Sequence, residues 1–209
     1  MQPKLPLRID ATQPEKLKAV LPQPLILSSQ PAGWRGIGLA YHCQSNYELP
    51  ETCPAQHIIS IYTKNFYANL MLNGRWQRLS YARNEVGIFP ADQISPAVQF
   101  MGELGFIHIY LEPTLLTKVA HEFVDSNRLE IVQQLQTHDP LIEQLGFTLK
   151  QELECSESDS YLYAESTANL LAVHLLKRYS IRKVRFPNYS GGLPKARLRE
   201  ITTYIQISR

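Results

Sequence analysis

The chain has 209 residues, 44% of them hydrophobic and 19% charged, and a formal net charge of +2. This composition is ordinary for a globular protein of one or two domains, and the apolar runs are far shorter than the about 20 residues that span a bilayer. The first residues lack the charged segment and apolar stretch of a signal peptide, so we expect a cytoplasmic protein. The three cysteines fit no zinc spacing, which favours reduced thiols.

Residues 1–33 predict an extended N-terminal arm. Six of the fourteen prolines lie in residues 1–32. Proline fixes φ and removes a backbone donor, so we expect at most one short helix, near Glu15–Val20. Two interpretations stay open: a disordered tail, or an arm that packs across a pocket.

Residues 34–112 predict a β-domain. Short stretches of alternating or β-branched residues are separated by Gly, Asn and Pro, and Asn73-Gly74 is a strong hairpin signal because both positions tolerate positive φ. This spacing is typical of a sandwich or barrel. The predicted strands are Gly36–Gln44, Ile58–Tyr62, Tyr67–Leu72, Arg75–Tyr81, Glu85–Phe89, Val98–Met101 and Phe106–Leu111.

The hydrophobic period changes to a helical one after Glu112, and residues 113–180 predict a helical segment. Pro113 suits the first turn of one helix, and Asp139-Pro140 opens a second. Ser158 or Ser160 could cap a third, longer helix that runs to about Tyr179. Strands followed by helices indicate an α+β fold rather than alternating βαβ units.

Residues 181–192 are polar, basic and end in Ser-Gly-Gly, which predicts a linker, and residues 193–209 predict one further helix. From residue 177 to the end there are nine basic residues and one acid, whereas the preceding part is mildly acidic. Any contact with a polyanion should therefore lie at the C-terminus, although a solvated basic tail explains the same pattern.

Three parts of the sequence together resemble the AraC family of bacterial transcription regulators. LNGRWQR at 72–78 and NEVGIFPA at 84–91 are similar to the hairpin and a strand of that family's sensor barrel. GFIHIYLEPTLL at 105–116 is similar to the last barrel strand and the helix after it. LLAVHLLKRY at 170–179 and GGLPKARLREITTYI at 191–205 resemble the long helix and the start of the DNA-binding domain.

The resemblance implies a cupin-like antiparallel β-barrel or jelly roll as sensor (34–112), a helical dimerisation segment (113–180) and the beginning of an all-α DNA-binding domain. One helix-turn-helix motif needs about 25 residues. Because only 16 follow from Pro194, we expect a truncated domain that retains its first helix and binds DNA weakly and non-specifically. Candidate backbone contacts are Arg182, Lys183, Arg185, Lys195, Arg197 and Arg199.

The candidate effector site is a mixed polar and aromatic strand face. Phe106, His108 and Tyr110 share one face of their strand and could bind a small organic effector of unknown identity, although an ordinary half-buried face also explains the pattern. His42, His57 and Trp76 complete the predicted ligand-binding set. A cupin metal site needs clustered histidines and an acid, and no His-x-His occurs, so we expect no metal or other cofactor.

The sequence contains no recognisable motif that pairs a nucleophile with a base, so we expect a binding module rather than an enzyme. The alternatives are a metal-dependent cupin-like enzyme, and a truncated regulator that acts through mixed dimers with a full-length relative. If the long helix acts as in the family, it forms a homodimer; otherwise its apolar residues only cover the barrel. The candidate dimer residues are Leu162, Leu170, Val173 and Leu176.

Overall fold

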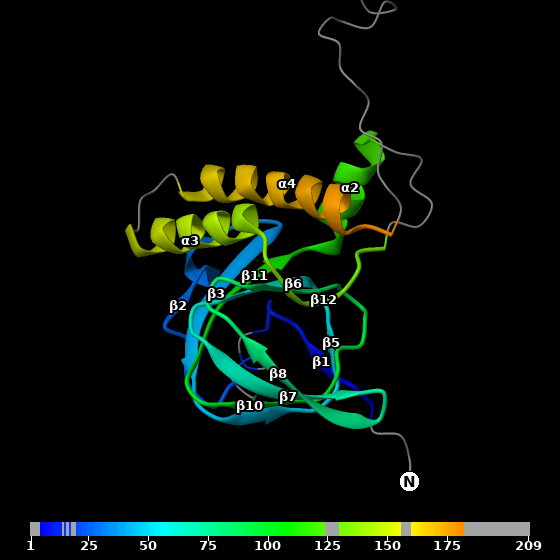
Figure 1. The fold of residues 1–209 in the computed structure, drawn as a ribbon. Helices are drawn as coiled ribbons and strands as arrows, with labels where there is room; N and C mark the ends of the chain where they lie inside the picture. Colours follow the sequence, from blue (N-terminus) through cyan, green and yellow to red (C-terminus); the bar gives the residue numbers. More distant parts are fainter. Residues whose placement is uncertain are drawn as a thin grey trace, which may run out of the picture.

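In the part of the chain that the structure describes, the fold consists of three β-sheets and a layer of helices (Figure 1). It is seen in a computed structural model that describes residues 5–13, 15, 17, 20–123, 130–155 and 160–181. None of the described helices is long and apolar enough to cross a membrane. The predicted linker after residue 181 and the predicted helix at 193–209 lie outside the described residues.

The largest sheet has six strands, and all its neighbouring pairs are antiparallel. A four-stranded antiparallel sheet lies opposite it, and a parallel pair of short strands stands beside them. In spatial order, the six are β12 (Gln134–Thr137), β9 (Val86–Phe89), β6 (His57–Tyr62), β11 (Leu104–Leu111), β3 (Ile37–Gln44) and β2 (Leu27–Ser28). The four are β4 (Tyr47–Leu49), β10 (Val98–Met101), β7 (Phe66–Leu72) and β8 (Arg75–Tyr81), and the pair is β1 (Leu7–Ile9) with β5 (Thr52–Pro54).

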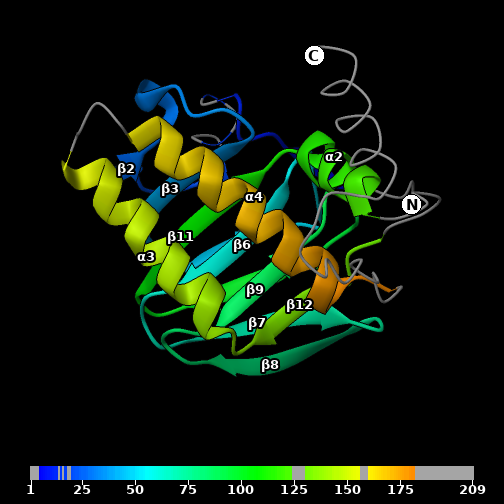
Figure 2. The same ribbon diagram turned by 90° about the horizontal axis from the view of Figure 1, so that it is seen from above.

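Helices α3 (Pro140–Cys155) and α4 (Ser160–Tyr179) lie across the outer face of the six-stranded sheet, and α2 (Pro113–Phe123) packs beside α4 (Figure 2). A 3₁₀ turn, η1 (Gln30–Ala32), precedes β3. Helix α4 contacts both α2 and α3. The sequence-based prediction of an α+β fold, with antiparallel β-strands followed by helices, is confirmed.

The hairpin between β7 and β8 forms where Asn73-Gly74 predicted it. Asn73 has a φ of 51° and Gly74 a φ of 74°, and Leu72 pairs with Arg75 across the two-residue turn. Positive φ at both central positions twists the turn in the same sense as the strands, which is why Asn-Gly is favoured there.

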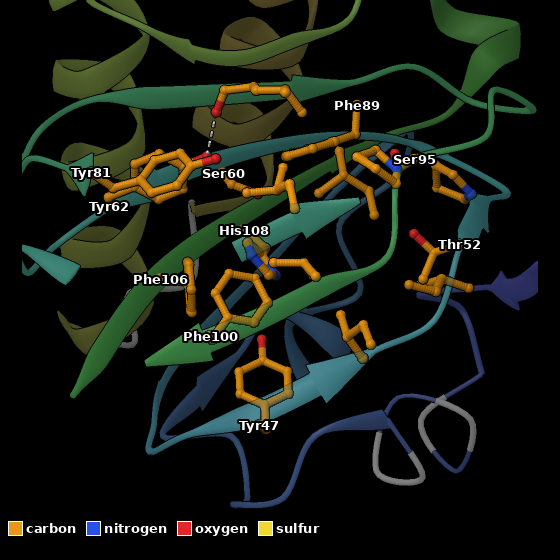
Figure 3. Close-up of a pocket in the computed structure, with 18 of the residues that line it drawn as sticks. Tyr47, Thr52, Ser60, Tyr62, Tyr81, Phe89, Ser95, Phe100, Phe106 and His108 are labelled. Carbon is orange, nitrogen blue, oxygen red and sulfur yellow. Dashed lines mark hydrogen bonds between the residues drawn. The ribbon is translucent and has the colours of Figure 1, made fainter. Parts of the chain in front are cut away.

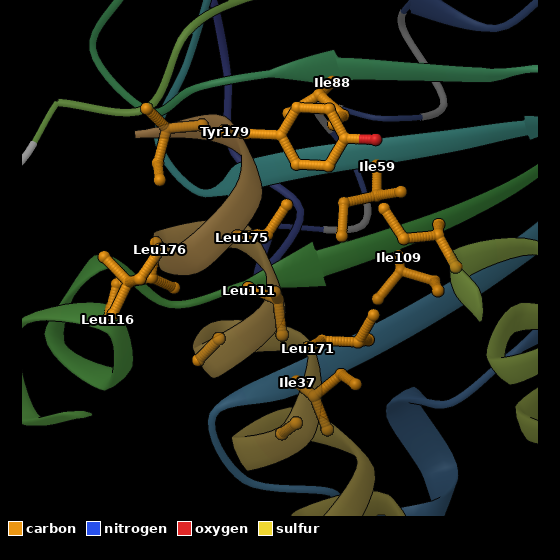
Figure 4. Packing of buried hydrophobic residues seen from close by; sticks show 14 of the residues in the cluster. Ile37, Ile59, Ile88, Ile109, Leu111, Leu116, Leu171, Leu175, Leu176 and Tyr179 are labelled. Atoms are coloured by element: carbon orange, nitrogen blue, oxygen red, sulfur yellow. The ribbon is translucent and has the colours of Figure 1, made fainter. Parts of the chain in front are cut away.

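The main hydrophobic core lies between the six-stranded sheet and the helices (Figure 4). Ile107, Ile109 and Leu111 of β11 are fully buried and point towards the helices, where Leu171 and Leu175 of α4 meet them. Successive side chains of a strand point to opposite faces. The other face of β11 therefore points into the space between the sheets, where a second, aromatic core lies.

One buried carboxylate ties the start of α3 to the end of α4. Asp139 Oδ1 accepts hydrogen bonds from the backbone N–H groups of Leu141 and Ile142, both at 3.2 Å, and so caps α3. Its Oδ2 accepts from the Tyr179 hydroxyl at 2.7 Å and from His174 Nε2 at 2.8 Å. The helix layer is thus held together by polar contacts as well as by the core.

The described part of the N-terminal arm packs on the barrel. Strand β1 pairs with β5, and the backbone N–H of Ala11 donates to Gln56 Oε1 at 3.0 Å. Further along, the side chain of Gln44 exchanges hydrogen bonds with the backbone of Gln23. Of the two interpretations of the arm, a packed segment describes these residues.

We predict that Ile109→Ala lowers the free energy of unfolding by about 2–5 kcal/mol, because it leaves a cavity in a fully buried position. The matched control is Ile94→Ala, since the Ile94 side chain is 57% exposed, and we expect a change of less than about 1 kcal/mol there. Urea denaturation of both variants measures the difference. Equal effects would contradict the assignment of β11 to the core.

Candidate ligand-binding cavity

A cavity of about 120 Å³ lies between the sheets, and strands of all three sheets line it (Figure 3). Its walls are mostly apolar, and none of the described lining residues is Asp, Glu, Lys or Arg. Its polar lining side chains are hydroxyls and one imidazole, that of His108. The aromatic lining residues are Tyr47, Tyr62, Phe66, Tyr81, Phe89, Phe100 and Phe106.

Several of these rings pack directly against one another and form a continuous wall. Phe66 stacks on Tyr81 with ring centroids 4.8 Å apart, and Tyr62 meets both rings edge-on. The buried Tyr62 hydroxyl donates to the carbonyl oxygen of Leu135 at 2.9 Å, and burial raises the pKa of Tyr62 well above its ordinary value. Tyr62 therefore serves as a neutral, hydrogen-bonded part of the wall.

A chain of hydrogen bonds runs from the N-terminal arm to the cavity wall. Its first link is the Gln44 side chain, whose Nε2 donates to the Gln23 carbonyl at 2.9 Å and lies 3.2 Å from His42 Nδ1. His42 Nε2 then lies 3.3 Å from His108 Nδ1. The two imidazoles meet edge to face, with ring centroids 4.8 Å apart. The hydroxyl of Tyr110 lies 3.4 Å from the same His108 Nδ1.

The backbone of Gln23 sets the direction of this chain. Its N–H donates to Gln44 Oε1 at 2.8 Å, which orients the amide so that Nε2 faces His42. His42 Nδ1 must then accept, so the proton of this neutral imidazole is on Nε2 and is donated to His108 Nδ1. Because His108 Nδ1 accepts this hydrogen bond, the single proton of the neutral His108 imidazole is on its other nitrogen, Nε2. The network therefore assigns the tautomers of both rings.

Burial keeps both imidazoles neutral. His42 is fully buried, and the loss of hydration lowers its pKa to about 4. Burial and then the neighbouring His42 lower the pKa of His108 well below its ordinary value. At neutral pH the pair therefore presents hydrogen-bonding groups without charge.

The structure brings together part of the predicted ligand-binding set. Phe106 and His108 line the cavity side by side, and His42 contacts both rings from behind them. Tyr110 reaches His108 but lines a second cavity, of about 400 Å³, between the N-terminal arm and β3. Trp34 also lines that second cavity.

Two residues of the predicted set, His57 and Trp76, do not line this cavity. His57 starts β6 on the face that points towards the helices, and its Nδ1 accepts from the backbone N–H of Ala91 at 3.1 Å. Trp76 pairs with Met71 on the outer face of the hairpin and is 47% exposed. Strand alternation places both side chains away from the described lining of the cavity.

Sequence reasoning missed most of the cavity wall. Ser60 was not singled out, although it alternates with Ile58 and Tyr62 on one face of a strand that was predicted correctly. That alternation is the signal that could have indicated it. Tyr47 and Thr52 come from very short strands, and Ile9 from the arm, so no periodicity pointed to them.

The structure also locates the other predicted sites. In α4, Leu162 and Leu170 are 67% and 44% exposed, whereas Val173 packs against the core. Leu176 is 1% exposed inside the core, which corrects its prediction as a dimer contact, because its side chain is buried within the chain. The six predicted DNA contacts, from Arg182 to Arg199, lie outside the described residues. Within the described part of the chain, no three His, Cys, Asp or Glu side chains converge as a metal site would require.

No protein-family model and no curated protein sequence matches the chain. Solved structures do resemble it in fold. ToxT from Vibrio cholerae, solved with a bound unsaturated fatty acid, is 10% identical with a TM-score of 0.49, and the similarity covers 76% of this chain and 60% of ToxT. The AraC-like transcriptional activator CuxR is 10% identical with a TM-score of 0.45, over 83% of this chain and 63% of CuxR.

A cupin superfamily protein from Desulfitobacterium hafniense is 15% identical with a TM-score of 0.34, over 54% of this chain and 93% of that protein. The chain thus spans about 60% of the length of ToxT, and its similarity to these proteins is one of fold.

The buried histidines predict that the protein loses stability in mild acid. The folded-state pKa of His42, about 4, lies below the unfolded value of about 6.5, so the unfolded chain binds more protons as the pH falls. The free energy of unfolding that depends on a neutral His42 is fully present above pH 6.5 and is lost as the pH falls towards 4. We expect a loss of about 2 kcal/mol from His42 between pH 7 and pH 5.

Urea denaturation at several pH values measures this dependence. His42→Gln should make it shallower but not abolish it, because burial also lowers the pKa values of His57 and His108. His138→Gln, at an exposed position, is the control. An unaltered pH dependence in His42→Gln would show that His42 is not buried in its neutral form.

Proposed function

We propose that the chain is the effector-sensing and dimerisation part of an AraC-type transcription regulator, and that its effector is a small, largely apolar molecule bound between the sheets. The observation that carries this proposal is the aromatic cavity, whose described lining contains no charged side chain. Apolar pockets with a few convergent polar groups are the usual form of a small-molecule site. A dry apolar cavity of about 150 Å³ binds benzene, so one of about 120 Å³ suits a molecule of similar size.

The polar groups of the cavity favour binding over catalysis. Among the described lining residues, Ser60 and His108 are the pair that most resembles a catalytic nucleophile and its base. A base must accept the proton of the nucleophile, but the free nitrogen of His108 carries a proton and its other nitrogen already accepts from His42. The lowered pKa of His108 weakens it further as a base. We therefore propose a binding module rather than an enzyme.

Toluene is a suitable first probe, because it is uncharged and slightly larger than benzene. We expect saturable binding to the wild-type chain and loss of at least about tenfold in affinity in Val98→Phe, whose added ring occupies the cavity. Val132→Phe is the matched control, since Val132 is 40% exposed and outside the described lining. Ligand-observed NMR measures the affinities. Unaltered binding in a folded Val98→Phe variant would place the probe elsewhere.

The outer face of α4 supports the dimerisation part of the proposal. Leu162, Tyr163 and Leu170 are exposed, and their spacing places them along one side of the helix. Exposed apolar side chains grouped on one helix face are typical of an association surface. The buried positions of the same helix, such as Leu171, already pack on the sheet, so the two faces serve different contacts.

We predict that the double variant Leu162→Glu/Leu170→Glu shifts the chain from dimer to monomer, because it introduces charges into the proposed contact. Leu141→Glu on α3 is the control, since Leu141 is 38% exposed on another helix. Sedimentation velocity over a range of concentrations measures the distribution. A wild-type chain that stays monomeric at high concentration would overturn the dimerisation proposal.

A further inference from the structure

Ser60 and His108 form a polar pair in the cavity wall. They lie directly opposite each other on the neighbouring strands β6 and β11, and both line the cavity (Figure 3). Side chains in such cross-strand pairs have Cβ atoms about 5 Å apart, so one atom of a ligand can contact both. Phe106 lies next to His108 on the same strand face and provides an apolar surface beside the pair.

The two polar atoms that face the cavity are free to bind a ligand. Among the described residues, neither His108 Nε2 nor Ser60 Oγ has a hydrogen-bond partner, although the Ser60 side chain is buried. The hydrogen-bond chain from Gln23 places the proton of His108 on Nε2. His108 can therefore only donate towards the cavity, whereas hydroxyls such as those of Tyr47 and Thr52 can donate or accept.

The absence of charge among the described lining residues restricts the ligand further. A carboxylate in this cavity would lose its hydration without meeting a Lys or Arg side chain, and an ammonium group would meet no Asp or Glu there. Burying an unpaired charge is far more costly than burying a neutral polar group with a partner. His108 does not supply the missing positive charge at neutral pH, because burial lowers its pKa.

We propose that the cavity recognises an uncharged molecule with a compact apolar body and one hydrogen-bond acceptor, such as a ketone, ester or amide carbonyl, which accepts from His108 Nε2 and Ser60 Oγ. This inference rests on the proposed function, since it specifies the ligand of the same cavity. The cavity should therefore bind carbonyl compounds more tightly than hydrocarbons or organic acids of the same shape.

Three compounds of nearly the same shape test the inference: acetophenone, which has a carbonyl, α-methylstyrene, which has a methylene group in its place, and benzoate, which is charged. We expect acetophenone to bind the full chain at least about fivefold more tightly than α-methylstyrene, because the hydrocarbon leaves the His108 donor unsatisfied. Benzoate should show no saturable binding at pH 7. Titrations followed by NMR give the three affinities.

Variants of the pair show whether the preference arises there. In Ser60→Ala and in His108→Phe, the ratio of the affinity for acetophenone to the affinity for α-methylstyrene should fall towards one, while α-methylstyrene still binds. Ser80→Ala is the control, since it removes a hydroxyl at an exposed position of β8 outside the described lining of the cavity and should leave the preference unchanged. If His108→Phe does not fold, Ser60→Ala and the nitrogen chemical shifts of His108, which report the protonated nitrogen, decide the outcome.

Each outcome has a distinct meaning. Equal affinity for acetophenone and α-methylstyrene, tight binding of benzoate, or a His108 proton on Nδ1 would overturn the inference while leaving a small-molecule cavity in place. If none of the compounds and not even toluene shows saturable binding, both the inference and the proposed function fail.

Discussion

Burial of both faces of the six-stranded sheet is the constraint on which the rest of the structure depends. In β11, Ile107, Ile109 and Leu111 point to the helices, and Phe106 and His108 point into the space between the sheets. The helix side is filled by leucine and isoleucine side chains, which interlock tightly. The other side is filled by flat rings that enclose a cavity. One strand thus contributes to stability with one face and to the candidate site with the other.

The buried polar chain from Gln23 to His108 joins the arm to this site. Buried polar groups are costly unless each has a partner, and here every link is hydrogen-bonded up to the cavity wall. The last group, His108, is the exception, because its Nε2 has no partner among the described residues. Within the described residues, this hydrogen-bond network therefore lacks a partner only at the cavity, where the proposed ligand would accept a hydrogen bond from His108 Nε2.

Helix α4 also has two different faces. Its inner face completes the core through Leu171, Leu175 and Leu176, and its outer face leaves Leu162 and Leu170 exposed. The contacts of Asp139 with His174 and Tyr179 hold the C-terminal end of α4 against the start of α3. The position of the outer face is therefore set by the same packing that builds the core, which couples the barrel to any surface formed by α4.

The sequence by itself determined the longer elements, because the local pattern of apolar residues specifies them: the strands from β3 to β11 that have clear alternation, the Asn73-Gly74 hairpin and the three helices. It also determined that Phe106 and His108 share a face. Only the tertiary structure decided the short strands β1, β2, β4, β5 and β12, since their residues show no clear alternation and pair with strands elsewhere in the chain. The meeting of His108 with His42 and Ser60, and the outward position of Trp76, depend on strand register, which is set by the packing of the whole sheet.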